Sequence, residues 1–137
     1  MSLRSITFTV RAKTGKENIR GDQDPLDILV LTEKNISTGG ILIQAIPIGG
    51  LLMIDKNEAD DKIIAVMKDD AVYGNIKDLS ELNEKQLNRL KHYFLTYKDM
   101  PGAKTRTVEI ASVYGKEEAH EVIRKSCSDY QNRFHQP

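Results

Sequence analysis

The chain has 137 residues, the size of one ordinary domain, and 39% of them are hydrophobic, which is enough for a core. Lys plus Arg and Asp plus Glu both number 20, so the formal net charge of zero gives no electrostatic reason to expect nucleic acid or an anionic membrane as a partner. The single cysteine, Cys127, excludes an intrachain disulfide and fits a reducing compartment. Met1–Val10 has no signal-peptide pattern, and Gln44 and Pro47 interrupt the longest apolar run, Gly39–Ile54. We therefore expect a cytoplasmic protein with one domain, residues 1–137, that does not span a membrane.

Short strand patterns dominate the first half of the chain. Arg4–Val10 alternates polar and apolar residues, which is strand periodicity, and Lys13–Gln23 is a polar loop. The run Ile28–Thr32 is rich in branched residues and predicts a buried strand. Three further strands are predicted at Ile41–Ile48, Leu51–Ile54 and Lys62–Met67, with a bulge or sharp bend at Gly49–Gly50.

Helical patterns appear after Lys77. Asn83, followed three residues later by Gln86, predicts a capping box at the start of a helix over Glu84–Lys98. Its apolar stripe is Leu87, Leu90, Phe94 and Tyr97. Lys104–Val113 predicts one more strand, and Gly115 opens a final helix whose stripe is Ala119, Val122, Ile123 and Tyr130. The pattern predicts a mainly β (α+β) fold, with a small bent sheet or barrel and two helices packed outside.

Three aspartates crowd the loop that enters the strand at residues 28–32, in the sequence Asp22-Gln23-Asp24-Pro25-Leu26-Asp27. Like charges repel at this spacing, and a bound cation relieves that repulsion. Ligands that are all oxygen select hard ions such as Mg²⁺, Mn²⁺ or Ca²⁺. A solvated turn or a weak Ca²⁺ site is the alternative for this loop alone. An EF-hand is disfavoured, because the glycine at loop position six and the glutamate at position twelve are missing.

A second acidic group follows, comprising Asp55, Glu58, Asp60 and Asp61. Asp55 ends one predicted strand and Asp60 immediately precedes the next, so their carboxylates can meet at one edge of the sheet. Asp27 can join them from a neighbouring strand. Lys62 follows Asp60 by two residues and therefore shares its strand face.

Tyr97 and Lys98 end the first predicted helix. Together with Lys62 and the aspartates they form a set typical of phosphoryl transfer, with carboxylates for metals, lysines for phosphate oxygens and a tyrosine hydroxyl. An ordinary surface position for each lysine, and a core-edge position for the tyrosine, are the competing interpretations.

These residues resemble the soluble family I inorganic pyrophosphatases. Asp22–Asp27 with the following Ile28–Leu31 matches the family signature. The Asp55/Asp60 pair, with Pro47–Gly50 before it and Lys62–Val66 after it, is similar to the family's second metal-binding hairpin. His92–Phe94 with Tyr97-Lys98 is similar to the helix that delivers the family's tyrosine–lysine pair, and the resemblance runs from Lys13 to Tyr130.

The resemblance implies a distorted five-stranded barrel of the OB type flanked by two helices. It implies Mg²⁺-dependent hydrolysis of pyrophosphate to two phosphates, with Mn²⁺ as a substitute metal, in a homo-oligomer (dimer or hexamer). Metal ligands would be Asp22, Asp27, Asp55 and Asp60. Asp24 would be the base near the nucleophilic water. Lys62, Tyr97 and Lys98 would bind the phosphates, with Tyr97 also in a catalytic role.

The family's amino-terminal part has no counterpart in this chain. It carries a metal-linked glutamate, phosphate-binding lysine and arginine, and a Tyr-Gly-Phe-Ile-Pro-like stretch, which Met1–Val10 does not match. We therefore expect a truncated, incomplete barrel with an exposed sheet edge, which Arg4–Val10 could fill within the chain or across a dimer. Two smaller departures are Gln23 in place of the usual glycine and Lys56 where some members carry an acid.

Three functions follow from these observations. The first is a Mg²⁺-dependent inorganic diphosphatase. The second is a catalytically impaired pyrophosphatase-fold fragment that binds metal or phosphate and assembles through an exposed sheet edge. The third, a Ca²⁺-binding β-module, depends only on the acidic loops, and Lys62 with Tyr97-Lys98 argues against it.

Overall fold

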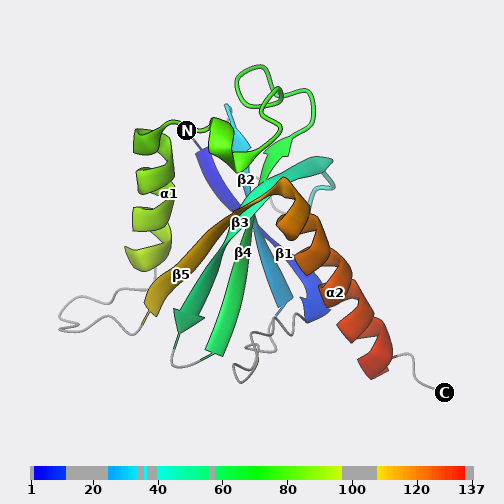
Figure 1. Cartoon of the computed structure of the whole chain (residues 1–137). Coiled ribbons are helices and arrows are strands. Elements are labelled where there is room, and N and C mark those ends of the chain that lie inside the picture. Colours follow the sequence, from blue (N-terminus) through cyan, green and yellow to red (C-terminus); the bar gives the residue numbers. More distant parts are fainter. Residues whose placement is uncertain are drawn as a thin grey trace.

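Five strands form one sheet, which two helices flank (Figure 1). The computed structural model describes residues 2–11, 25–33, 36, 40–55, 58–96 and 108–134. The elements are β1 (Ser2–Arg11), β2 (Pro25–Thr32), β3 (Ala45–Asp55), β4 (Glu58–Met67), a 3₁₀ helix (Leu79–Glu81), α1 (Glu84–Thr96), β5 (Val108–Gly115) and α2 (Lys116–Phe134). The expected mainly β fold with five strands and two flanking helices is thus confirmed.

The strand order is β1-β2-β4-β3-β5, so β1 and β5 are the two edges of an open sheet. β2 pairs with β4 in parallel, and the other pairs are antiparallel. β1 pairs with β2 of its own chain, so the segment predicted to extend the sheet does so within the chain. The central position of β2 and β4 explains their nearly continuous apolar runs, because both faces of these strands are buried.

Each face of the sheet has its own hydrophobic core. On one face, α1 packs Leu90 and Phe94 against Leu29 and Ile64. On the other face, α2 contributes Ala119 to a core that includes Ile63. Because side chains alternate along a strand, consecutive residues of β4 pack into the cores on opposite faces of the sheet. The same alternation decides on which face each polar residue of β4 lies.

The capping box predicted for α1 is present. The amide N–H of Gln86 donates to Asn83 Oδ1 at 2.8 Å, and the amide N–H of Asn83 donates to Gln86 Oε1 at 3.1 Å. α1 is described as far as Thr96, and Tyr97 and Lys98, which the prediction included in this helix, lie outside the described residues. α2 begins one residue after Gly115, as predicted.

Several predicted boundaries are wrong. The bulge predicted near Gly49–Gly50 is present between Pro47 and Gly49, but β3 runs unbroken through it, so the two strands predicted on either side are one. Residues 41–44 are not strand. β4 begins at Glu58, which places Asp60 inside the strand, since the β3–β4 pairing continues to Asp55 and Glu58. β2 begins at Pro25, so Asp27 is its third residue.

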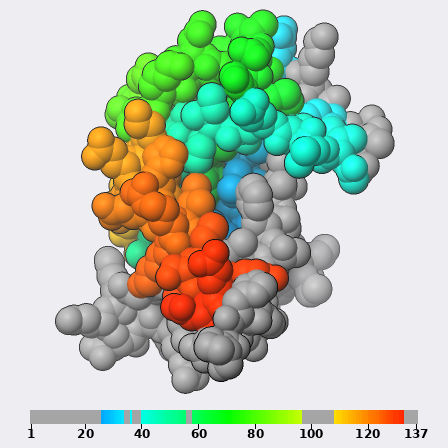
Figure 2. Space-filling view, turned by 90° about the vertical axis from the view of Figure 1, so that its right-hand side faces the viewer, coloured from blue at the N-terminus to red at the C-terminus, as the bar shows by residue number. Residues whose placement is uncertain are grey.

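Residues 40–45 project beside the α2 face and overhang a hollow there (Figure 2). The hollow is an apolar groove of about 430 Å³, whose floor includes Ile28 and Ala65 and whose wall includes Ile123 of α2. Leu42, on the overhang, is fully exposed. Neither helix in the described part of the chain has the length and hydrophobicity needed to cross a membrane.

Candidate active site

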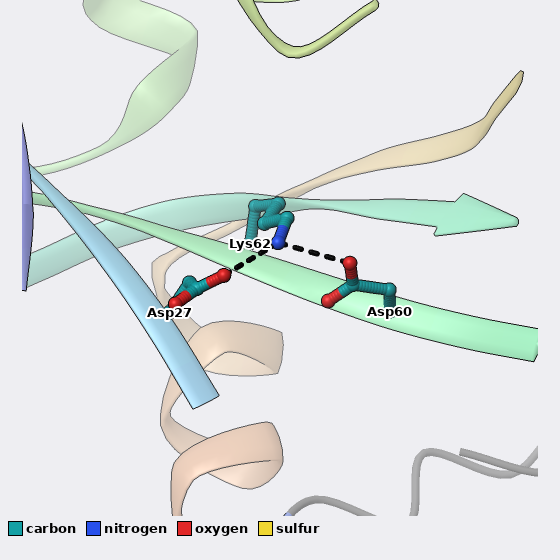
Figure 3. Close-up of polar contacts among 3 residues, drawn as sticks. All are labelled: Asp27, Asp60 and Lys62. Carbon is teal, nitrogen blue, oxygen red and sulfur yellow. Dashed lines mark hydrogen bonds and ion pairs between the residues drawn. The ribbon is translucent and has the colours of Figure 1, made fainter. Parts of the chain in front are cut away.

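A buried lysine lies between two aspartates on the α1 face of the sheet (Figure 3). Lys62 Nζ donates to Asp27 Oδ2 at 2.6 Å and is 2.9 Å from Asp60 Oδ2. The Lys62 side chain is only 3% exposed, whereas those of Asp60 and Asp27 are 14% and 31% exposed. The ammonium is therefore inside the protein, while both carboxylates still reach the surface.

The register of three neighbouring strands brings these residues together. Lys62 of β4 is the pairing partner of Asp27 in the parallel β2. Asp60 precedes Lys62 by two residues in β4, so both side chains lie on the same face, as the sequence predicted. On the other side, Leu51 of β3 pairs with Lys62 and packs in the core beneath α1. Lys62 therefore lies at the boundary between this core and the end of the sheet that carries Asp27 and Asp60.

The charge on Lys62 is stabilised by its partners. Burial alone would lower the pKa of the ammonium, because a low-dielectric environment disfavours the charged form. The negative charge of Asp60 and the hydrogen bonds to Asp27 and Asp60 outweigh that penalty and raise the pKa well above its ordinary value of 10.5. Lys62 is therefore a permanent cation at any physiological pH.

Asp55 lies at the same end of the sheet. It follows Met53 by two residues in β3, and Met53 is the pairing partner of Asp60. Alternation therefore gives Asp55 the same face as Asp60 and Lys62. From its start at Glu84 to its end at Thr96, α1 runs towards the same end of the sheet (Figure 1).

Half of the predicted site residues lie outside the described residues, namely Asp22, Asp24, Tyr97 and Lys98. Asp22 and Asp24 precede β2, which starts at Pro25, and Tyr97-Lys98 follow the end of α1. Within residues 25–33, 40–55, 58–96 and 108–134, no three His, Cys, Asp or Glu side chains are gathered closely enough to hold a metal ion. Of the four predicted metal ligands, the described part contains Asp27, Asp55 and Asp60.

The chemistry of this donor set fits a hard divalent cation. Both carboxylates already converge on one positive charge, the Lys62 ammonium. Carboxylate oxygens are the ligands that Mg²⁺ and Mn²⁺ prefer. Asp27 and Asp60 are also partly exposed, so an ion from solvent can reach them.

Sequence reasoning missed a second polar contact on β4, on the opposite face. Tyr114 Oη donates to Asp61 Oδ1 at 2.7 Å, and both residues are buried. Burial, together with the negative charge of Asp61, raises the pKa of Tyr114 well above its usual range, so this phenol stays protonated. The sequence pattern indicates Asp61 only as one of several acidic residues near the start of β4. Its position between Asp60 and Lys62, out of phase with both, was the signal that it serves the other face.

Comparison with known proteins identifies the family. A sequence model described as inorganic pyrophosphatase matches residues 7–131. The chain belongs to the inorganic pyrophosphatase family. It is 56% identical over 126 residues to a Chlamydia trachomatis protein named inorganic pyrophosphatase, a match that covers 89% of this chain and 60% of that protein. An inorganic pyrophosphatase of Nanoarchaeum equitans is 40% identical over 120 residues, covering 85% of this chain and 72% of the relative.

The fold agrees with that family. The crystal structure of inorganic pyrophosphatase from Thermus thermophilus superimposes with a TM-score of 0.74 at 28% identity, covering 90% of this chain and 66% of that structure. The OB-like fold expected for a pyrophosphatase is thereby confirmed. The chain spans about 60% of the length of the chlamydial relative.

Proposed function

We propose that this chain hydrolyses inorganic pyrophosphate to two orthophosphates with Mg²⁺. The observation that carries the proposal is the arrangement of Asp27, Asp60 and Lys62, in which two surface-reaching carboxylates surround a buried cation. Membership of the inorganic pyrophosphatase family supports the choice of substrate.

In this proposal the carboxylates hold the metal. Asp27 and Asp60, together with Asp55 and Asp22, are the ligands, and Mn²⁺ is the expected substitute because it prefers the same oxygen donors. When bound, such ions act as Lewis acids that polarise the phosphoryl oxygens and make water more acidic.

The other side chains of this proposal serve the substrate. Lys62 contributes a cation that cannot lose its proton near neutral pH, which suits it to bind a phosphate oxygen. Its two carboxylate partners fix the ammonium in place before substrate arrives, so little reorganisation is needed. Asp24 is proposed as the base near the attacking water, and Tyr97 and Lys98 as further phosphate ligands.

The alternative is a pyrophosphatase-fold fragment that binds metal or phosphate without appreciable turnover. The observation that favours it is the chain's coverage of only 60% of the chlamydial relative. If cationic groups that stabilise the leaving phosphate belong to the remaining part, each missing group costs on the order of 10²–10³ in rate. Assembly into a dimer or hexamer, and a cytoplasmic location, remain proposals in both cases.

The experiment compares phosphate release by matched variants. Asp60→Asn keeps the side-chain shape but removes a charged ligand, and Glu109→Gln makes the same chemical change at an exposed position of β5. We expect Asp60→Asn to lower Mg²⁺-dependent release by at least about 100-fold, as loss of a central electrostatic contact does. Glu109→Gln should leave the rate unchanged. Equal rates for the two variants would refute the assigned site.

A further inference from the structure

One buried contact of β4 is not used by the proposed reaction. Asp61 lies between Asp60 and Lys62, and its side chain points to the opposite face of the sheet. There it accepts a 2.7 Å hydrogen bond from Tyr114 Oη, and Asp61 and Tyr114 are only 4% and 7% exposed. A buried carboxylate is costly unless it is hydrogen-bonded, so this contact is a strong restraint on the β4 backbone.

Tyr114 reaches Asp61 across an intervening strand. It lies in β5, whereas Asp61 lies in β4, and β3 runs between them. The residue of β3 that pairs with Tyr114 is Gly50. A Cβ atom at Gly50 would lie 2.6–2.7 Å from Cε2, Cζ and Oη of the tyrosine ring. The ring therefore crosses β3 over a position where only glycine leaves enough room.

We propose that Tyr114, crossing over Gly50, acts through Asp61 as a positioning pair for Asp60 and Lys62. This inference deepens the proposed function, because it concerns the same site. The pair restrains β4 from the α2 face, at the residue that separates Asp60 from Lys62. Neither Asp61 nor Tyr114 faces the substrate side, so they act on the reaction only through the strand.

The expected effect is a loss of alignment rather than a loss of fold. Without the Tyr114 hydroxyl, the Asp61 carboxylate would turn to find another partner, and the backbone between Asp60 and Lys62 would shift with it. Misplacement of a reacting group by about 1 Å can cost about 100-fold in rate, so a smaller shift should cost about tenfold. Substrate affinity, measured as KM, should change less than kcat, because the other phosphate ligands are unaffected.

The primary test does not depend on catalysis. A lysine ammonium buried between carboxylates exchanges its protons slowly enough to give its own signal in a side-chain ¹⁵N NMR spectrum, and Lys62→Met identifies that signal by removing it. Tyr114→Phe, which deletes only the hydroxyl, should shift or broaden the Lys62 signal in the folded protein. Ser126→Ala is the matched control, because it deletes a buried α2-face hydroxyl for which the described residues provide no hydrogen-bond partner. This control should leave the signal unchanged.

Variants of Asp61 separate the hydrogen bond from the charge. Asp61→Asn keeps an oxygen that can accept from Tyr114, whereas Asp61→Leu removes the acceptor. The proposal predicts that Asp61→Leu reproduces the Tyr114→Phe spectrum and that Asp61→Asn stays close to the native one. An unchanged Lys62 signal in folded Tyr114→Phe, or an equal shift in Asp61→Asn and Asp61→Leu, would overturn the positioning role.

The same variants distinguish this inference from the proposed function. If the native chain hydrolyses pyrophosphate, Tyr114→Phe should lower kcat about tenfold with a smaller change in KM. A native chain without turnover would overturn the proposed function, while the Lys62 signal would still decide the positioning role.

Discussion

Replacing Lys62 by Met tests the electrostatic core of the site. Methionine has a similar unbranched length and keeps the packing of the stem, but it removes the positive charge. Asp27 and Asp60 would then face each other without the ammonium that now bridges their Oδ2 atoms at 2.6 and 2.9 Å. The variant should therefore be less stable than the native chain in metal-free buffer.

The exposure of the three side chains sets the magnitude. Removing one partner of a fully buried ion pair costs about 3–5 kcal/mol, and an exposed pair contributes about 0–1 kcal/mol. Lys62 is 3% exposed, but Asp27 is 31% exposed and can be rehydrated. We therefore expect Lys62→Met to lower the free energy of unfolding by an intermediate amount, about 2 kcal/mol, which corresponds to a decrease in Tm of about 6–10 °C for a chain of this size.

Thermal unfolding with and without millimolar Mg²⁺ provides the assay. A ligand of the native state raises Tm, and the ion should stabilise Lys62→Met more than the native chain, because no ammonium competes for the carboxylates. Lys68→Met is the control, since Lys68 is exposed just beyond the end of β4 and its replacement should change stability by less than about 0.5 kcal/mol. Equal Tm values for the native chain and Lys62→Met, in metal-free buffer, would refute the proposed bridge.

Three further predictions concern stability. Asp78→Ala should cost about 1–2 kcal/mol in urea unfolding, because Asp78 accepts from the amides of Ser80 and Lys116 and so caps both the 3₁₀ helix and α2. The same hydrogen bonds lower the pKa of Asp78, so their contribution to the free energy of unfolding is complete above the ordinary value of 3.8 and is lost as the pH falls further. The difference in stability between native and Asp78→Ala proteins should therefore be smaller below about pH 4 than at pH 7. Leu90→Ala should cost about 2–5 kcal/mol by chemical denaturation, because Leu90 is fully buried, whereas Val113→Ala at an exposed site of β5 should cost far less.

The sequence predicted the helices and strands well where the interactions that form them lie within a few residues of one another. The capping box of Asn83 and Gln86 and the spacing of Leu87, Leu90 and Phe94 act within a few residues, and α1 has the predicted start. The glycine pair at 49–50 was a weaker signal. It correctly indicated a bulge, which lies between Pro47 and Gly49, but the strand is not interrupted there, and Gly50 also makes room for the ring of Tyr114.

The contacts that build the site could not be predicted from local patterns. The bond between Lys62 and Asp27 depends on the parallel pairing of β2 with β4, which joins residues 35 positions apart. Spacing correctly placed Asp60 and Lys62 on one face, but it could not reveal that Lys62 bridges two aspartates. No local pattern indicates a role for Tyr114, since a tyrosine in a short strand carries no signal for a partner 53 residues away.

Release of orthophosphate from pyrophosphate by the purified native chain is the decisive assay of the proposed hydrolysis. We expect release well above the uncatalysed background in millimolar Mg²⁺, abolished by a chelator and restored by added Mg²⁺ or Mn²⁺. A folded chain that binds Mg²⁺ at Asp27 and Asp60 but releases no phosphate would contradict it, and would identify the chain as a metal-binding pyrophosphatase fragment without turnover.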